Sequence, residues 1–477
     1  FKVRPTLLDR RRIDALTRTS FDAETTQYIQ NLGKGLLMLR GRAGTGKTIG
    51  LLQIALHLAK QNKHTEVITF NHGLISDITR TLRLLQDQDP SLKIVPELKT
   101  RYAFIQDMFK RKFGKRAERT VINHIGEIEE REDFRVHALM NTDSFLAESI
   151  GEPCSNHWCP CKGVGVSKWE HICETGKQVP LPDFVLVDEG QDWKEEHRQL
   201  VYELVGPESV VVADGVDQFV SQHRCKWDID GIPINRRHRL RTSRRTRSAT
   251  SQTLADIAHE LGIEWDIEAN NEIPGGRVSV LVEPNPRSAI QRGLKIVEAD
   301  QRSNDSVKSI DQLVCLPAGS VKGVNFENLF DQATIDADRD SWRGFDENDR
   351  RIYPLRDGQL RAVRYESCRG MEGWTTLCLG LDVFYDRRTE NPEVDEGYLA
   401  DSLKKSRKDK FTEDLLSEKL EHARRMYAFN WLMIPLTRSI DHLVLHLRDE
   451  NSNLGIILKS VSEKYPGQIE WLRNDGK

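Results

Sequence analysis

Residues 35–59 read Gly35-Leu-Leu-Met-Leu-Arg-Gly-Arg-Ala-Gly-Thr-Gly-Lys-Thr-Ile-Gly-Leu-Leu-Gln-Ile-Ala-Leu-His-Leu-Ala59. The apolar run 35–40 predicts a buried strand, and the spacing of apolar residues over 49–59 predicts a helix. Between them, Gly41 to Thr48 fit the pattern G-x-x-x-x-G-K-[ST]. Glycines in such a loop let backbone N–H groups approach an anion where the helix begins. Strand, loop and helix in this order predict a site for the phosphates of a nucleoside triphosphate.

Each residue type in this loop has an expected role. Lys47 is expected to reach the β- and γ-phosphates, and the Thr48 hydroxyl is expected to coordinate Mg²⁺. ATP and Mg²⁺ are therefore the expected cofactors. Further contacts to the nucleotide are expected from Gly41, Gly44, Thr45 and Gly46. A chance match is the alternative, which the flanking strand and helix disfavour.

The composition describes a charged chain of several domains. Its 477 residues predict two or three domains. No apolar run reaches membrane-spanning length, so we expect a soluble protein without a membrane partner. Eight cysteines without the spacing of secreted domains favour a reducing, cytoplasmic compartment. Because the chain opens at Phe1 without an initiator Met, we expect a processed or partial product, from which an upstream domain could be missing.

Apolar runs typical of buried strands recur along the chain, with helical stretches between them. They are 65–70, 184–187, 210–213, 278–282, 313–316, 375–381 and 443–447. This alternation predicts an α/β fold with parallel sheets covered by helices. We place a boundary after residue 235, which gives a first α/β domain over 1–235 and a second over 236–477.

Two insertions are expected in the first domain. Residues 84–140 are charged and helical in pattern, and residues 151–180 are rich in Cys, Gly and Pro. For the basic run 110–119, a solvated helix face and a groove that follows phosphates stay equal alternatives. In the second domain, the charge-rich stretch 387–420 predicts a long helical excursion.

Four cysteines gather in the second insertion. Cys154, Cys159, Cys161 and Cys173 could supply four soft ligands for a tetrahedral Zn²⁺ ion. Because C-x-C is not the usual C-x₂-C spacing, free thiols and a redox or iron–sulfur role stay open beside structural zinc. The other four are expected to fill the interior: Cys225, Cys315, Cys368 and Cys378.

A second motif, Phe184-Val-Leu-Val-Asp-Glu-Gly-Gln-Asp192, is an apolar strand that ends in acids. A carboxylate at the C-terminal end of a strand beside the glycine loop can hold Mg²⁺, which is the role expected of Asp188. The next carboxylate, Glu189, can orient and deprotonate an attacking water.

The two motifs together resemble those of the superfamily 1 helicases, most closely the UvrD/Rep type. The resemblance extends from about residue 20 to residue 447. Further matching elements are Thr69-Phe-Asn71, Thr142-Asp-Ser-Phe145, Asp214-Gly-Val-Asp-Gln218, Leu240-Arg-Thr-Ser-Arg-Arg-Thr246, Ser367-Cys-Arg-Gly-Met-Glu372 and Leu432-Met-Ile-Pro-Leu-Thr-Arg-Ser439. The resemblance implies two RecA-like parallel-sheet domains, with ATP between them and a single nucleic-acid strand across their top.

The resemblance also implies roles for residues of the nucleotide site. Gln27 would read adenine, and Gln218 would sense the γ-phosphate. Arg245 and Arg438 would stabilise the charge that develops on the γ-phosphate during hydrolysis. The ribose would be met by the segment that contains Gly370 and Glu372.

Contacts with the nucleic-acid strand are implied for Phe70, Asn71, Thr142, Phe219 and Trp227. His223 stands where the family carries a tryptophan that stacks on bases, so Phe70, Trp193, Phe219 and Trp227 are the candidate substitutes. Ordinary core packing is the equal alternative for each. Arg244 likewise replaces the aromatic residue that the family places near the adenine.

The expected function is an ATP hydrolase of the helicase type that translocates along single-stranded nucleic acid. The resemblance implies 3′-to-5′ polarity and favours DNA over RNA. The short stretch before Ser367 lacks the large second insertion of processive helicases, so translocation is expected rather than extensive unwinding. The main alternative is a regulatory ATPase module that controls an attached or partner effector such as a nuclease. A scaffold that binds nucleic acid without hydrolysis is a third hypothesis, which the acids and arginines disfavour.

Overall fold

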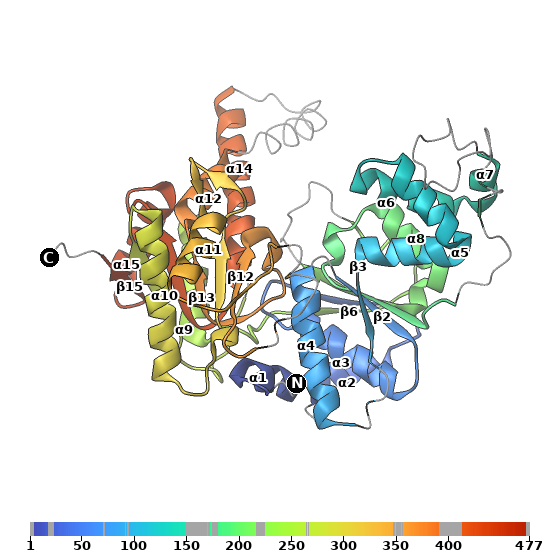
Figure 1. Ribbon diagram of the computed structural model, residues 1–477, viewed down its shortest axis with the longest axis horizontal. Coiled ribbons are helices and arrows are strands. Elements are labelled where there is room, and N and C mark those ends of the chain that lie inside the picture. The colour runs from blue at the N-terminus through green and yellow to red at the C-terminus, as the bar shows by residue number, and fades with distance from the viewer. Residues whose placement is uncertain are drawn as a thin grey trace.

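Two largely parallel β-sheets organise this chain, and helices cover both faces of each (Figure 1). The computed structural model describes residues 4–17, 23–69, 72–90, 92, 95–148, 169, 172–173, 180–215, 225–263, 265, 267–346, 349, 354, 356–390 and 413–473. The prediction of an α/β fold with parallel sheets is confirmed.

The first sheet has six strands in the order β3-β2-β4-β5-β1-β6. The strands are β1 (Leu36–Gly41), β2 (Thr65–Thr69), β3 (Glu97–Thr100), β4 (Phe184–Val187), β5 (Val210–Gly215) and β6 (Ile234–Leu240). Every pair is parallel, so the carboxyl ends of all six strands lie at one edge. Strands β1, β4 and β5 are almost wholly buried, as expected for a parallel sheet with helices on both faces.

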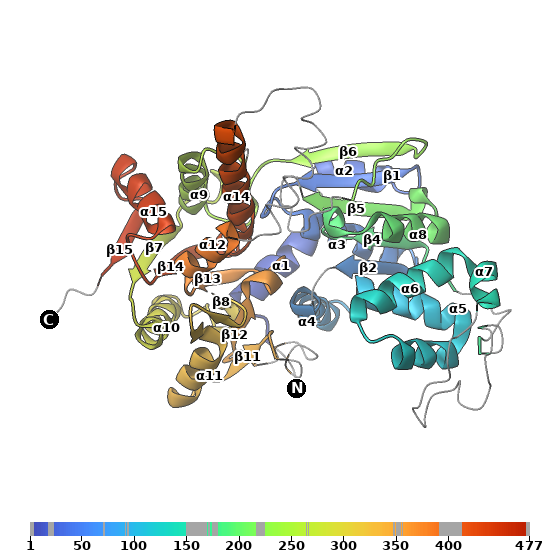
Figure 2. The same cartoon turned by 90° about the horizontal axis from the view of Figure 1, so that it is seen from above.

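Alternate residues of these strands build two different cores. On one face, Leu37 and Leu39 pack with helices α2 (Ala23–Gln30) and α3 (Lys47–Lys60). On the other face, Leu36 and Met38 pack with α5 (Arg101–His124), α6 (Ile128–Met140) and α8 (Glu195–Val205). Helix α4 (His72–Gln88) lies on the side that faces the second sheet (Figure 2).

The helical insertion lies on the outer side of the first sheet (Figure 1). It consists of α5, which is kinked at Gly114, α6 and the short helix α7 (Thr142–Ala147). These helices begin after β3, so the insertion starts at Arg101 and not at the predicted residue 84. Of the second insertion, the structure describes only Trp169, Ile172, Cys173 and Pro180, with the cysteines at 154, 159 and 161 outside the described residues.

The second sheet has seven strands in the order β11-β12-β8-β13-β14-β7-β15. They are β7 (Arg277–Val282), β8 (Leu313–Leu316), β11 (Ser341–Arg343), β12 (Leu360–Arg364), β13 (Gly373–Cys378), β14 (Ser439–Leu447) and β15 (Ile469–Leu472). All of their pairs are parallel. A separate two-stranded hairpin is formed by β9 (Ser320–Val321) and β10 (Val324–Asn325).

Helices also cover both faces of the second sheet. One core contains residues of α9 (Ser248–Glu260), α12 (Leu381–Thr389), α14 (Glu413–Leu436) and α15 (Asn453–Lys464). The opposite core contains residues of α10 (Pro286–Ser303) and α11 (Phe326–Asp336). Of the predicted excursion 387–420, residues 391–412 lie outside the described part of the chain.

The predicted boundary after residue 235 falls within β6. β6 pairs with β1 on both sides of this boundary, at Ile234 and from Arg236 to Leu240, so the first sheet ends at Leu240. We call the part of the chain built around the six-stranded sheet the first half, and the part from Arg241 on, built around the seven-stranded sheet, the second half. Near the N-terminus, helix α1 (Leu7–Thr17) lies between the two halves in both views (Figures 1 and 2). None of the described helices has the length and apolar character that a membrane span requires.

Candidate functional site

The glycine loop, residues 41–48, joins β1 to α3 at the carboxyl edge of the first sheet. Gly44 and Gly46 have φ angles of 82° and 92°, which favour glycine. A Cβ atom added to Gly41 would lie 2.5 Å from Thr45 Oγ1 and 2.8 Å from the Leu240 carbonyl. Helix α3 then begins without a side-chain cap, so its first N–H groups face the loop. This is the geometry by which loops of this pattern hold phosphate groups.

Lys47 is buried inside the loop. Its Nζ donates to the carbonyl oxygens of Gly41, at 2.7 Å, and Arg42, at 3.0 Å. Burial lowers the pKa of Lys47, against the opposing charges of Glu189 and Asp188. The ammonium group therefore lies between the loop backbone and two carboxylates, in the place where a phosphate would need a positive charge.

The acidic segment, residues 188–192, follows β4 at the same edge. Thr48 Oγ1 donates to Asp188 Oδ2 at 3.0 Å, so a hydroxyl and a carboxylate oxygen lie side by side. Burial, and then the charge of Glu189, raise the pKa of Asp188 to about 6. Hydroxyl and carboxylate oxygens are the hard donors that Mg²⁺ takes from proteins, so Thr48 and Asp188 fit this ion.

Gln191 fixes the position of Glu189. Its Nε2 donates to Glu189 Oε2 at 2.7 Å, and its Oε1 accepts from the Gly215 N–H at 2.7 Å. Burial alone would raise the pKa of Glu189, but the positive charge of Lys47 and of Arg369 holds it below its ordinary value. Glu189 is therefore an ionised carboxylate in a fixed orientation, which a general base requires.

Two arginines of the second half face this edge. Arg438 is buried at the end of α14, where its Nε donates to the Ile434 carbonyl at 2.7 Å. Burial, and then the charge of Arg245, lower the pKa of Arg438 to about 10. Arg245 follows β6, and its Nε donates to Glu372 Oε1 at 2.9 Å.

One pocket is lined by residues of both halves. Its walls are Ala43, Gly44, Gly46, Lys47, Thr48, Ile49, Glu189, Arg244, Arg245, Gly370, Glu372 and Arg438. The structure thus brings together the predicted loop, one predicted acid and the two predicted arginines. Since these residues come from separate strand ends and loops, only the folded arrangement of both sheets creates the pocket.

Contacts that the sequence did not predict hold the two halves together beside this pocket. Arg369, three residues before Glu372, pairs with the Asp192 carboxylate of the acidic segment. Arg42 of the glycine loop lies 4.8 Å from the ring centroid of Trp265 in the second half. The only sequence signal for Arg369 is its place beside Gly370 and Glu372 in the element 367–372.

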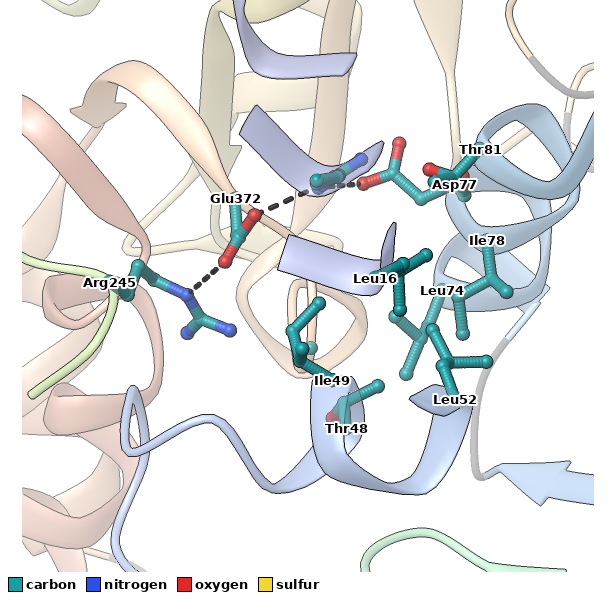
Figure 3. Close-up of a pocket in the computed structure, with 12 residues that line it drawn as sticks. Leu16, Thr48, Ile49, Leu52, Leu74, Asp77, Ile78, Thr81, Arg245 and Glu372 are labelled. Atoms are coloured by element: carbon teal, nitrogen blue, oxygen red, sulfur yellow. Dashed lines mark hydrogen bonds and ion pairs between the residues drawn. The ribbon is translucent and has the colours of Figure 1, made fainter. Parts of the chain in front are cut away.

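A second pocket adjoins the first and is shown in Figure 3. On one side lie Arg245 and Glu372, and on the other lie apolar side chains of α1, α3 and α4, among them Leu16, Leu52 and Leu74. We call the charged residues of this region the junction cluster: Arg12, Asp77, Arg245, Arg361 and Glu372. It was not predicted, because no local pattern in the sequence joins these residues.

Each acid of the junction cluster has two arginine partners. Glu372 accepts from Arg245 and, at 3.0 Å, from Arg12. Asp77 accepts from Arg12 at 2.7 Å and from Arg361 at 2.8 Å. Burial alone would raise the pKa of Glu372, but the charges of Arg245, Arg12 and Arg11 hold it well below its ordinary value. The pKa of Asp77 is likewise lowered, because Arg12 and Arg361 outweigh its burial.

Of the residues predicted to contact nucleic acid, the structure describes Thr142 and Trp227, and neither lines the two pockets. Trp227 is buried, packs against Trp193 at 5.5 Å between ring centroids, and donates from Nε1 to the Gly190 carbonyl at 2.8 Å. The prediction that Trp227 contacts nucleic acid is therefore wrong, since its ring supports the acidic segment from within the core. Trp193 is also buried, so neither tryptophan presents a stacking face.

Thr142 lies at the start of α7, on the far side of the first sheet from the second sheet (Figures 1 and 2). In the same helix Phe145 is buried in an aromatic cluster with Phe113 and Trp169. Thr142 is therefore remote from the pocket between the halves. The other predicted contacts, Phe70, Asn71 and Phe219, lie outside the described residues, as do Gln218 and the side chain of Gln27.

Of the four cysteines that could bind zinc, the structure describes only Cys173. Cys173 is buried, and burial raises the pKa of its thiol to about 12. The prediction that the other four fill the interior is confirmed for Cys225, Cys315, Cys368 and Cys378. Among the described residues, His64, Glu66 and Glu97 are close enough to share a metal ion, but Lys99 Nζ already pairs with Glu66 at 2.9 Å and with Glu97 at 3.0 Å.

A comparison with known protein families finds no family model that matches this chain, and a comparison with curated proteins finds no match. The functional argument therefore rests on the residues and geometry of the pocket between the halves.

Proposed function

We propose that this chain is an ATP hydrolase of two RecA-like domains, which bind ATP between them and convert its hydrolysis into movement along single-stranded nucleic acid. The observation that carries the proposal is the pocket lined by both halves. A glycine loop alone would indicate nucleotide binding. The loop, a fixed carboxylate and two arginines around one pocket form a set suited to cleaving a phosphoanhydride.

Each residue has a role that follows from its surroundings. Lys47 and the loop backbone hold the phosphates, and Arg245 and Arg438 neutralise charge that develops on the γ-phosphate. Glu189, held by Gln191, takes the proton of the attacking water. Mg²⁺, held by Thr48 and Asp188, would supply positive charge that orients the phosphates.

Coupling to movement follows from where these groups are attached. The loop and acids belong to the first sheet, whereas Arg438 and Glu372 belong to the second. Hydrolysis then depends on how closely the halves approach, so each cycle of ATP binding and product release shifts one half against the other. The nucleic-acid strand, with DNA favoured over RNA, is proposed from the motif resemblance alone, as is 3′-to-5′ polarity. A cytoplasmic location is proposed from the spacing of the cysteines.

The test is steady-state ATP hydrolysis by the purified chain, alone and with single-stranded DNA or RNA. We expect turnover that one polymer stimulates and that Lys47→Ala abolishes. Turnover that survives in Lys47→Ala would contradict the assignment of the glycine loop. Absence of turnover under all conditions would contradict the proposed function.

One observation favours a second function, a regulatory ATPase module that controls an effector such as a nuclease. The halves are joined by largely buried ion pairs of Arg12 with Glu372, Arg361 with Asp77 and Arg369 with Asp192, which oppose wide opening. A module that switches between two close arrangements needs only small movements. ATP turnover that is indifferent to both polymers would favour this second function over translocation.

A further inference from the structure

Helix α1 is built into the junction between the halves. Its apolar residues Ile13 and Leu16 join a core with Leu52, Leu74 and other residues of α3 and α4. Its buried Asp9 accepts from Arg80 of α4 at 2.8 Å. Thr6, the residue before the first residue of the helix, donates from its hydroxyl group to Asp311 of the second half. The helix therefore packs on the first half while its N-terminal end is bonded to the second.

Two consecutive arginines of α1 hold the segment that carries Arg245. Arg11 Nη2 donates to the carbonyl oxygens of Arg244, at 3.0 Å, and Arg245, at 2.9 Å. Arg12 Nε donates to Glu372 Oε2, whose other oxygen accepts from Arg245. Arg11 thus fixes the backbone at Arg245. Arg12 binds Glu372, the same acid that binds the side chain of Arg245.

This sharing matters because Arg245 would have to exchange partners. In the pocket its guanidinium is bonded to Glu372, whereas stabilising a γ-phosphate requires bonds to phosphate oxygens. A buried carboxylate that loses its only cation is strongly destabilised. Glu372 keeps a second cation, Arg12, so Arg245 can turn away without leaving an unpaired, largely buried charge.

Arg12 is itself held from both halves. Its Nη2 donates to Asp77 of α4, and Asp77 also accepts from Arg361 of β12. The guanidinium therefore spans one acid of each half, and its geometry depends on how the halves are placed. A change in their spacing alters the bond between Arg12 and Glu372, and with it the hold of Glu372 on Arg245.

We propose that Arg12 is a positioning residue for Arg245: by keeping Glu372 paired, it allows Arg245 to move from Glu372 to the γ-phosphate. The proposal rests on the proposed ATP hydrolysis and adds to it a residue that no motif contains. It assigns α1 a part in the catalytic cycle, besides packing.

The test compares Arg12→Met with Arg12→Met/Glu372→Gln. In the single variant Glu372 has Arg245 as its remaining side-chain cation and holds it more tightly, so kcat is expected to fall roughly 10- to 100-fold. The KM for ATP is expected to change less than threefold, because the substitution leaves ground-state binding of ATP largely intact. The affinity for a fluorescent ATP analogue, measured with EDTA present, is expected to change equally little. Replacing Glu372 by a neutral amide removes that hold, so the double variant is expected to regain most of the lost kcat.

Arg10→Met is the matched control, because Arg10 lies on the exposed side of the same helix and carries the same charge. Its kcat is expected to equal that of the parent. If Arg12→Met does not fold, Arg12→Lys takes its place, since lysine lacks the separate Nε and Nη2 donors by which Arg12 bonds Glu372 and Asp77. A reduced kcat that Glu372→Gln restores again supports the proposal.

An unchanged kcat in Arg12→Met or Arg12→Lys would overturn the proposal, and so would a double variant no faster than the single one. These outcomes are distinct from failure of the proposed function. If the parent hydrolyses ATP and Lys47→Ala does not, the ATPase stands whatever Arg12 does. If the parent shows no hydrolysis, both proposals fall together.

Discussion

Two buried acid clusters lie within one region of this molecule, and they are compensated differently. In the acidic segment, Asp188 and Glu189 are neighbours, Lys47 is the cation that lowers their pKa values most, and the pKa of Asp188 is nevertheless raised to about 6. In the junction cluster, Asp77 and Glu372 each bind two arginines, and both carboxyl pKa values are lowered. The first cluster has carboxylate charge left for a metal ion and a reacting water, whereas the second is saturated with protein cations.

The difference indicates how this fold divides its tasks. Charges that are incompletely paired are costly to bury, and they persist where a ligand completes them. Charges that are fully paired across the two halves fix the relative position of those halves and of Arg245. Damage to the first cluster should therefore affect chemistry, and damage to the second should affect stability and the positioning of Arg245.

The largest expected effect is that of Glu189→Gln. Removing a general base is expected to lower kcat by about 10²- to 10⁴-fold. Stability should change little, because the lost attraction to Lys47 is offset by relief of the repulsion from Asp188. Steady-state hydrolysis and urea unfolding measure the two effects, with the exposed Glu196→Gln as control. Full turnover in Glu189→Gln would show that another group is the base.

Asp77→Asn tests the opposite side of the comparison. It leaves the buried guanidinium groups of Arg12 and Arg361 without their shared carboxylate, and breaking a buried pair in this way costs about 3–5 kcal/mol. Urea unfolding measures the loss, and Asp87→Asn on the exposed side of the same helix is the matched control. Equal stability of the two variants would mean that the junction cluster is dispensable for stability.

The ion pairs of Asp77 also predict a pH dependence, which a comparison of the parent with Asp77→Asn can measure. Because the folded-state pKa of Asp77 is lowered, its contribution is fully present above the ordinary aspartate pKa and is lost as the pH falls through the lowered value. The stability gap between the parent and Asp77→Asn should therefore close toward acid. A gap that is constant from neutral pH into this acid range would contradict the ion-pair explanation.

The smallest expected effect is that of Trp227→Phe. It removes the bond from Nε1 to the Gly190 carbonyl and should cost roughly 1 kcal/mol of stability. Because Trp227 is buried, the affinity of the chain for single-stranded DNA should be unchanged in a fluorescence-anisotropy titration. A weaker affinity at full stability would restore Trp227 to the nucleic-acid surface.

Most of the interior strands were predictable, and most of the missed strands lie at sheet edges. Continuous apolar runs gave β4 and β8 with their observed bounds. Strands β3, β6, β11 and β15 are the edges of the two sheets and lack such runs. Their faces are less completely covered, as the partial burial of β3, β11 and β15 shows, so continuous apolar sequence is not required there. β6 is strongly basic and contains no apolar run, so its sequence does not predict a strand.

The interior strand β12 was missed for another reason. Its buried Arg361 interrupts the apolar run, and the arginine is tolerated there because it pairs with Asp77. That partner is 284 residues away in the sequence. No local pattern could show that this charge belongs in the interior.

Local sequence is enough to predict the glycine loop, the acidic segment and the α/β character, because each depends on neighbouring residues within one strand, turn or helix. Tertiary structure alone decided which charges meet. With 70 Lys and Arg and 73 Asp and Glu in the chain, composition allows very many pairs. The bond between Arg12 and Glu372 joins residues 360 positions apart. Packing selects such pairs, since a buried charge is tolerated only where the fold brings its partner within hydrogen-bonding distance.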